Sequence, residues 1–85
     1  MSAPIRLVVV DDHALFRRGL VGILNDIAEF TVVGEASNGR EALPVIQNLK
    51  PDVVLMDVNM PEMDGIEAVE QVRSTSLPVR ILMLT

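Results

Sequence analysis

Four oxygen-bearing side chains stand at the ends of apolar runs that predict buried strands. Asp11 and Asp12 follow "IRLVVV" (5–10), Asp57 ends "DVVLMD" (52–57), and Thr85 ends "RILMLT" (80–85). Carboxylates that lie close together raise one another's pKa unless a cation separates them. Oxygen ligands without a His or Cys cluster favour Mg²⁺ or a similar hard divalent ion. Such an ion beside a carboxylate and a hydroxyl is a set that can perform phosphoryl transfer.

Asp57 is the strongest candidate nucleophile of this set, because it alone stands at the end of a central strand, which would aim it rigidly into the pocket. Its carboxylate would attack phosphorus and become an aspartyl phosphate. Two simpler interpretations remain open from the residues alone. Asp57 can merely begin a loop, and Asp12 can cap the helix that follows it. The conjunction of all four side chains at strand ends favours the functional interpretation.

The rest of the chain supplies the elements that would position these residues. Continuous apolar runs are typical of parallel strands covered by helices, and the more broken "FTVVGEA" (30–36) suits a sheet edge. A helix is predicted over 14–27, a second after "SNG" with Ser37 or Asn38 as its cap, and a third after Asp64. The first helix has one apolar stripe, with Arg17 and Arg18 off it; the stripe contains Phe16, Leu20, Ile23, Leu24 and Ile27. Pro44 falls inside the second helix, where irregularity is expected.

Strands alternating with helices predict a three-layer α/β fold with a parallel sheet. The carboxyl ends of parallel strands share one edge of the sheet, and ligands bind outside that edge. If the strands from Ile5 and Asp52 are neighbours, the carboxylates of Asp11, Asp12 and Asp57 converge there. The positive end of the helix that begins at Ala14 would lie at the same edge.

Composition narrows the function classes. With 85 residues the chain can form at most one domain. The absence of cysteine excludes disulfides and thiolate metal sites. No apolar run is long enough for a signal peptide or a membrane span, so a cytoplasmic protein is expected. The net charge of −5, with no basic run, provides no electrostatic footprint for nucleic acid.

The motifs resemble those of response-regulator receiver domains, and more closely the NarL/FixJ branch. The matching stretches cover nearly the whole chain; they are "VVVDDHALFRRGL", "VVGEASNGREAL", "PDVVLMDVNMPEMDGIEA" and "ILMLT". The resemblance implies a flavodoxin/CheY-like sheet with the strand order 2-1-3-4-5. The four predicted strands of this chain correspond to the first four strands of that sheet. It also implies a two-component signalling function and a sensor histidine kinase as partner.

The resemblance assigns a role to each candidate residue. Asp57 matches the phosphoacceptor, Asp12 a direct Mg²⁺ ligand, and Asp11 an acidic partner that acts on the metal largely through water. Asn59 would contribute its backbone carbonyl to the Mg²⁺, and Thr85 matches the hydroxyl that turns toward a phosphoryl oxygen. His13 is interpreted as the residue that usually follows the acidic pair in this branch, without a catalytic role. The resemblance implies a phosphoacceptor with self-catalysed chemistry rather than an enzyme.

The chain departs from the family pattern after the fourth strand. We expect residues 1–85 to be a truncated receiver, without the fifth strand, the last two helices or an output domain. The lysine that ends the fifth strand in the family has no match, since the only lysine, Lys50, precedes the strand from Asp52. Activation is therefore expected to be impaired. The strand from Arg80 would be an exposed edge, open to a homodimer or a swapped oligomer.

Two other functions compete with the phosphoacceptor. One is a catalytically silent, self-associating interaction module with a receiver-like fold. The other is an aspartyl-phosphate phosphatase of the haloacid-dehalogenase kind, which would need a second Asp two residues after the nucleophile. Asn59 stands at that position, so the phosphatase ranks last.

Overall fold

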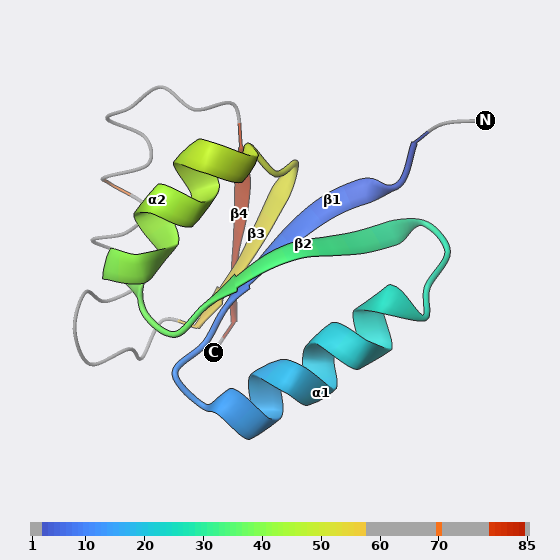
Figure 1. Cartoon of the computed structure of the whole chain (residues 1–85), viewed down its shortest axis with the longest axis horizontal. Coiled ribbons are helices and arrows are strands. Elements are labelled where there is room, and N and C mark those ends of the chain that lie inside the picture. The colour runs from blue at the N-terminus through green and yellow to red at the C-terminus, as the bar shows by residue number, and fades with distance from the viewer. Residues whose placement is uncertain (1–2, 58–69, 71–78, 85) are drawn as a thin grey trace.

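The computed structural model describes residues 3–57, 70 and 79–84 (Figure 1). The predicted third helix, apart from Glu70, lies outside these residues, as do Asn59 and Thr85. No helix in the described part of the chain has the length and apolar character needed to cross a membrane.

A four-stranded parallel sheet forms the centre of the fold. Its strands are β1 (Ile5–Val10), β2 (Phe30–Ala36), β3 (Val53–Asp57) and β4 (Arg80–Leu84). They lie in the order β2-β1-β3-β4 (Figure 1). The predicted α/β fold is confirmed, as are the position of β2 at an edge and the adjacency of β1 and β3.

The two described helices lie on opposite faces of the sheet (Figure 1). On one face, α2 (Gly39–Leu49) packs Ala42 and Ile46 against Val8, Val10 and other sheet residues. On the other face, α1 (Ala14–Asn25) packs Leu24 against Leu7 and Val9. The helices thus sandwich β1, whose residues from Leu7 to Val10 are at most 3% exposed. This strand is the rigid mount that carries the first two acidic residues.

The burial of β3 differs from the prediction that it is covered on both faces. Val54 and Met56 are fully buried on the α2 side, whereas Val53 and Leu55 on the α1 side are only half-buried. On β4, Leu82 pairs with Leu55 and is 55% exposed. The reason is the placement of α1, which packs on β1 and β2 and leaves this face of β3 and β4 open among the described residues.

The predicted inward face of α1 is also partly wrong. Leu24 is buried and Leu20 packs beside it, but Phe16 and Ile23 are 57% and 64% exposed. Val21, which the predicted stripe omitted, contacts the sheet in their place. The helix ends at Asn25, two residues before the predicted end, with Asp26 as its C-cap. Apolar spacing alone could not show which edge of a wide stripe would meet the sheet.

The second helix begins as predicted, and its cap is Asn38. The Asn38 side chain accepts a hydrogen bond from the amide of Glu41 at 2.8 Å. Glu41 in turn accepts bonds from the amide and hydroxyl of Ser37, at 3.1 and 2.5 Å, in a reciprocal capping arrangement. These two bonds, followed by the charge of Arg17, lower the pKa of the Glu41 carboxyl. Pro44 lies inside the helix, which continues through it to Leu49.

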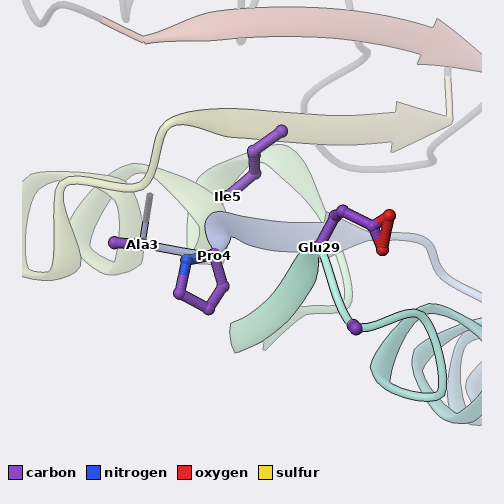
Figure 2. A pocket seen from close by; sticks show the side chains of 5 residues that line it. Ala3, Pro4, Ile5 and Glu29 are labelled. Carbon is purple, nitrogen blue, oxygen red and sulfur yellow. The ribbon is translucent and has the colours of Figure 1, made fainter. Parts of the chain in front are cut away.

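A shallow hollow lies at the amino end of β1, away from Asp11, Asp12 and Asp57. It is lined by Ala3, Pro4, Ile5, Ala28 and Glu29, of which four are labelled in Figure 2. The Ile5 amide donates to the Glu29 carbonyl across its floor at 2.8 Å. The lining carries one ionisable side chain, so the hollow lacks the convergent polar groups of a catalytic site.

Candidate phosphoacceptor and metal site

Four side chains meet at the carboxyl edge of the sheet. Asp11, Asp12 and His13 follow β1, and Asp57 is the last residue of β3. Val10 pairs with Met56, so the next residue of each strand lies at the same level of the sheet. Each of the four side chains offers one atom that could bind a metal ion, and these atoms all lie within 4.8 Å of one another. The predicted convergence of the three carboxylates is therefore present in the structure, with His13 added to it.

Asp11 is held in place by three hydrogen bonds. Its amide donates to the Ala36 carbonyl at the end of β2 at 3.1 Å. Its Oδ1 accepts from the His13 amide at 2.7 Å, which fixes the side chain against the turn that leaves β1. Its own carbonyl accepts from Arg17 Nη1 at 2.6 Å. The residue is 3% exposed, so its carboxyl group is buried here in a fixed position.

Asp12 is not the helix cap that the simpler interpretation required. The N-cap of α1 is His13, and no side chain caps the helix. Asp12 Oδ1 is buried and accepts no hydrogen bond from the described residues. His13 Nδ1 lies 3.0 Å from that oxygen, and the two atoms are close without hydrogen-bond geometry. A buried carboxylate oxygen without a donor is costly unless a cation binds it.

His13 lies over the acidic pair from the solvent side. Its side chain is 74% exposed, and Nδ1 is 3.4 Å from Asp11 Oδ1 as well as 3.0 Å from Asp12 Oδ1. The sequence interpretation treated His13 only as the residue after the acidic pair. The structure brings its ring within reach of both carboxylates, because the turn after β1 is closed by the bond from its amide to Asp11.

The residues present fit a hard divalent ion. Ligands on opposite sides of an octahedral Mg²⁺ lie about 4.2 Å apart, so a cluster spanning 4.8 Å needs only a small contraction to surround one ion. The carboxylates of Asp11, Asp12 and Asp57 supply the oxygen ligands that Mg²⁺ prefers. The unsatisfied oxygen of Asp12 is the atom that most requires such a partner.

Sequence reasoning missed a pair of residues beside the site, Arg17 and Glu35. Arg17 was placed off the apolar stripe, but its side chain is only 14% exposed. Its Nε donates to Glu35 Oε1 at 3.0 Å, while Nη1 donates to the Asp11 carbonyl. The available signal was the position of an arginine in the first turn of a helix that starts directly after the acidic pair.

Asn59 and Thr85 are outside the described residues. Lys50 ends α2 in the left-handed conformation, just before β3 begins, and its carbonyl accepts from Arg6 Nη1 at 2.9 Å. The lysine therefore lies at the amino end of β3, whereas Asp57 lies at its carboxyl end.

The chain has clear relatives among proteins of known family. A family model described as "Response regulator receiver domain" matches residues 7–85. The probable transcriptional regulatory protein NarL of Mycobacterium tuberculosis is 47% identical over 89 residues, which cover all of this chain and 41% of that protein. The chain spans about two-fifths of the length of such curated relatives.

Solved structures agree with the family match. The signal receiver domain of the NarL response regulator from Mycobacterium tuberculosis aligns with a TM-score of 0.91 and 46% identity, over 96% of this chain and 66% of that one. A CheX–CheY–BeF3–Mg+2 complex from Borrelia burgdorferi aligns with a TM-score of 0.85 and 28% identity, over 94% of this chain and 60% of that one. The chain therefore belongs to the response regulator receiver domains of two-component systems, within the NarL/FixJ branch.

Proposed function

We propose that this receiver accepts a phosphoryl group on Asp57 with the help of Mg²⁺ held by Asp11, Asp12 and Asp57. The backbone carbonyl of Asn59 is proposed as a further ligand, and Thr85 as the hydroxyl that contacts the phosphoryl group. The observation that carries the proposal is the buried Asp12 oxygen without a donor, in a cluster of three converging carboxylates.

The chemistry follows from the placement of these side chains. Asp57 attacks phosphorus through a carboxylate oxygen, the bond from phosphorus to the donor breaks, and the donor leaves with the bonding electron pair. A bound Mg²⁺ neutralises the charge of the phosphoryl oxygens. Asp57 ends a strand that pairs with β1 and β4. Its direction of attack is therefore fixed by the sheet, and alignment supplies a large part of the rate gain.

The similar CheY complex supports this assignment. It contains BeF3 and Mg+2 together. Trifluoroberyllate has the shape and charge of a phosphoryl group, so the complex contains a stand-in for that group together with the metal ion. The same combination is proposed for the carboxyl edge here.

The proposed phosphodonor is a sensor histidine kinase, because the family works in two-component systems. Residues 1–85 are proposed to act as one receiver domain that contacts no nucleic acid itself. It is proposed to be a phosphoacceptor with self-catalysed transfer and hydrolysis. A second copy of the chain is a further proposed partner, through the edge of β4.

The test is the phosphorylation of Asp57 from a small phosphodonor. The chain is incubated with acetyl phosphate and Mg²⁺, and intact mass is measured for the wild type and for Asp57→Asn. We expect one phosphoryl group on the wild type and none on the variant. When EDTA is added before the phosphodonor, we expect no adduct on the wild type either. Asp52→Asn is the matched control, because Asp52 lies at the opposite edge and accepts a bond from the Arg6 amide.

The competing function would give a different result. A silent interaction module would show no adduct on the wild type under any of these conditions. An adduct of equal yield on the wild type and Asp57→Asn would place the chemistry on another residue.

A further inference from the structure

We infer that Arg17 and Glu35 form a clamp that positions the metal-binding loop, so that Arg17 is a positioning residue for Mg²⁺ binding. The inference rests on the proposed function, because it concerns the same site. Arg17 touches neither the phosphoryl group nor a metal-binding oxygen in this account. It acts through the backbone of Asp11.

The clamp joins three elements at the carboxyl edge. Arg17 lies in the first turn of α1, and its Nη1 donates to the Asp11 carbonyl just after β1. Its Nε donates to Glu35 near the end of β2. The planar guanidinium makes both bonds from one rigid group, which fixes the helix relative to both strands.

The bond to the Asp11 carbonyl has a direct effect on the ligands. That carbonyl belongs to the peptide plane that links Asp11 to Asp12, so its direction sets where the Asp12 side chain leaves the backbone. The amide on the other side of Asp11 is held by the Ala36 carbonyl. With both backbone groups of Asp11 fixed, the two carboxylates keep their separation even though their charges repel each other.

The partner Glu35 holds the guanidinium in place. The Arg17 and Glu35 side chains are 14% and 32% exposed, so the ion pair is shielded more than a surface pair. Arg17 also contributes to the lowered pKa of Glu41 at the start of α2. The bond to Glu35 keeps the guanidinium directed at the loop.

Positioning and simple charge predict opposite results. Arg17 is a cation near a cation-binding site, so by charge alone its removal should tighten Mg²⁺ binding. If Arg17 positions the loop, its removal should weaken Mg²⁺ binding instead. Residues that orient metal ligands from outside typically contribute 10- to 100-fold in affinity.

The experiment measures the Mg²⁺ dissociation constant by calorimetry on the full chain. We expect Arg17→Gln to raise it about 10-fold. Arg17→Lys keeps the charge but cannot bond both partners as a fork, so it should also raise the constant, by a smaller factor. Arg18→Gln is the matched control, an exposed neighbour with the same charge change, and should stay within about twofold of the wild type.

A second readout separates positioning from loss of folding. At saturating Mg²⁺, the rate of Asp57 phosphorylation in Arg17→Gln should return to within about twofold of the wild type, because only the loop and not the nucleophile has changed. Circular dichroism in EDTA checks that each variant is folded, and Arg17→Lys decides the question if Arg17→Gln unfolds.

Two results would overturn the inference in distinguishable ways. Unchanged or tighter Mg²⁺ binding in both Arg17 variants, with a wild type that binds Mg²⁺ and is phosphorylated, contradicts the clamp alone. A wild type that binds no Mg²⁺ contradicts the proposed function, and the clamp with it.

Discussion

At the scale of single residues, the site is an arrangement of like charges that folding holds together. Asp11 is almost fully buried and Asp12 has a buried oxygen without a hydrogen-bond donor. Three carboxylates in so small a space destabilise the fold unless a cation joins them. The destabilisation caused by these carboxylates is therefore linked to metal binding. A bound cation that neutralises their charges should also raise the free energy of unfolding.

Replacing Asp12 with Asn should separate stability from binding. In EDTA, Asp12→Asn removes one of the repelling charges, and we expect the free energy of unfolding to rise by on the order of 1 kcal/mol. In Mg²⁺ at about 100 times its dissociation constant, the wild type should gain about 2.7 kcal/mol and the variant much less. Urea unfolding followed by circular dichroism measures both.

Glu29→Gln is the control for this prediction, because it removes one negative charge at the opposite edge of the sheet, beside the hollow. It should leave the gain from Mg²⁺ intact. Equal stabilisation of Asp12→Asn and the wild type by Mg²⁺ would show that Asp12 is not a ligand.

The candidate site was predictable at this scale only in part. The three aspartates could be placed together because parallel strands end at one edge, and neighbouring strands bring their last residues to the same level. The contribution of Arg17 could not be predicted, because its side chain reaches back past the helix start to a carbonyl six positions earlier. Side-chain reach of that kind depends on the angle between helix and sheet, which apolar spacing does not determine.

At the scale of elements, the close approach of α2 to the sheet depends on one glycine. The pairing of β1 with β2 shifts register between Leu7 and Val8, and Gly34 follows the extra residue. A Cβ placed on Gly34 would lie 2.7 Å from Leu49 Cδ1 and 3.1 Å from Val45 Cγ1. The absence of a side chain thus lets the helix sit directly on β2.

Two glycine substitutions should therefore have opposite signs. Gly34→Ala should lower the free energy of unfolding by about 1 to 3 kcal/mol, because the valine and leucine of α2 must move. Gly22→Ala should raise it by up to about 1 kcal/mol, since Gly22 lies within α1 and nothing is within 4 Å of its added Cβ. Thermal unfolding of both variants tests this; a stabilised Gly34→Ala would mean that α2 does not pack as described.

The order and type of the elements were predictable because apolar runs and helical spacing repeat along the chain. Their lateral placement was not. Phe16 and Ile23 belong to an apolar stripe that only partly meets the sheet, and β3 is well covered on one face alone. Periodicity defines a face of a helix, but the position of that helix over the sheet depends on how all the layers pack together.

At the scale of the whole molecule, the described structure leaves several large apolar side chains exposed. In the described strand order, β4 is an edge. Leu82 on β4 is 55% exposed, and Phe16 and Ile23 of α1 are exposed as well. A strand that has a neighbour on only one side among the described residues, and that carries an exposed apolar side chain, is a template for association with another chain.

We therefore expect the chain to self-associate through β4. Light scattering coupled to size exclusion should show a mass above that of the monomer that rises with concentration. Leu82→Lys should shift the distribution toward the monomer, because it places a charge on the proposed contact. Thr31→Lys places the same charge on an exposed position of β2, the other edge strand, and should leave the mass distribution unchanged. A monomer at all concentrations would contradict this expectation.

The most direct test of the account is to locate the phosphoryl group within the chain. After reaction with acetyl phosphate and Mg²⁺, the acyl phosphate is reduced with borohydride, and the modified residue is identified by tandem mass spectrometry of the digested chain. We expect reduction of Asp57 in the wild type and of no residue in Asp57→Asn. Modification of Asp11 or Asp12, or a chain that takes up no phosphoryl group in saturating Mg²⁺, would contradict it.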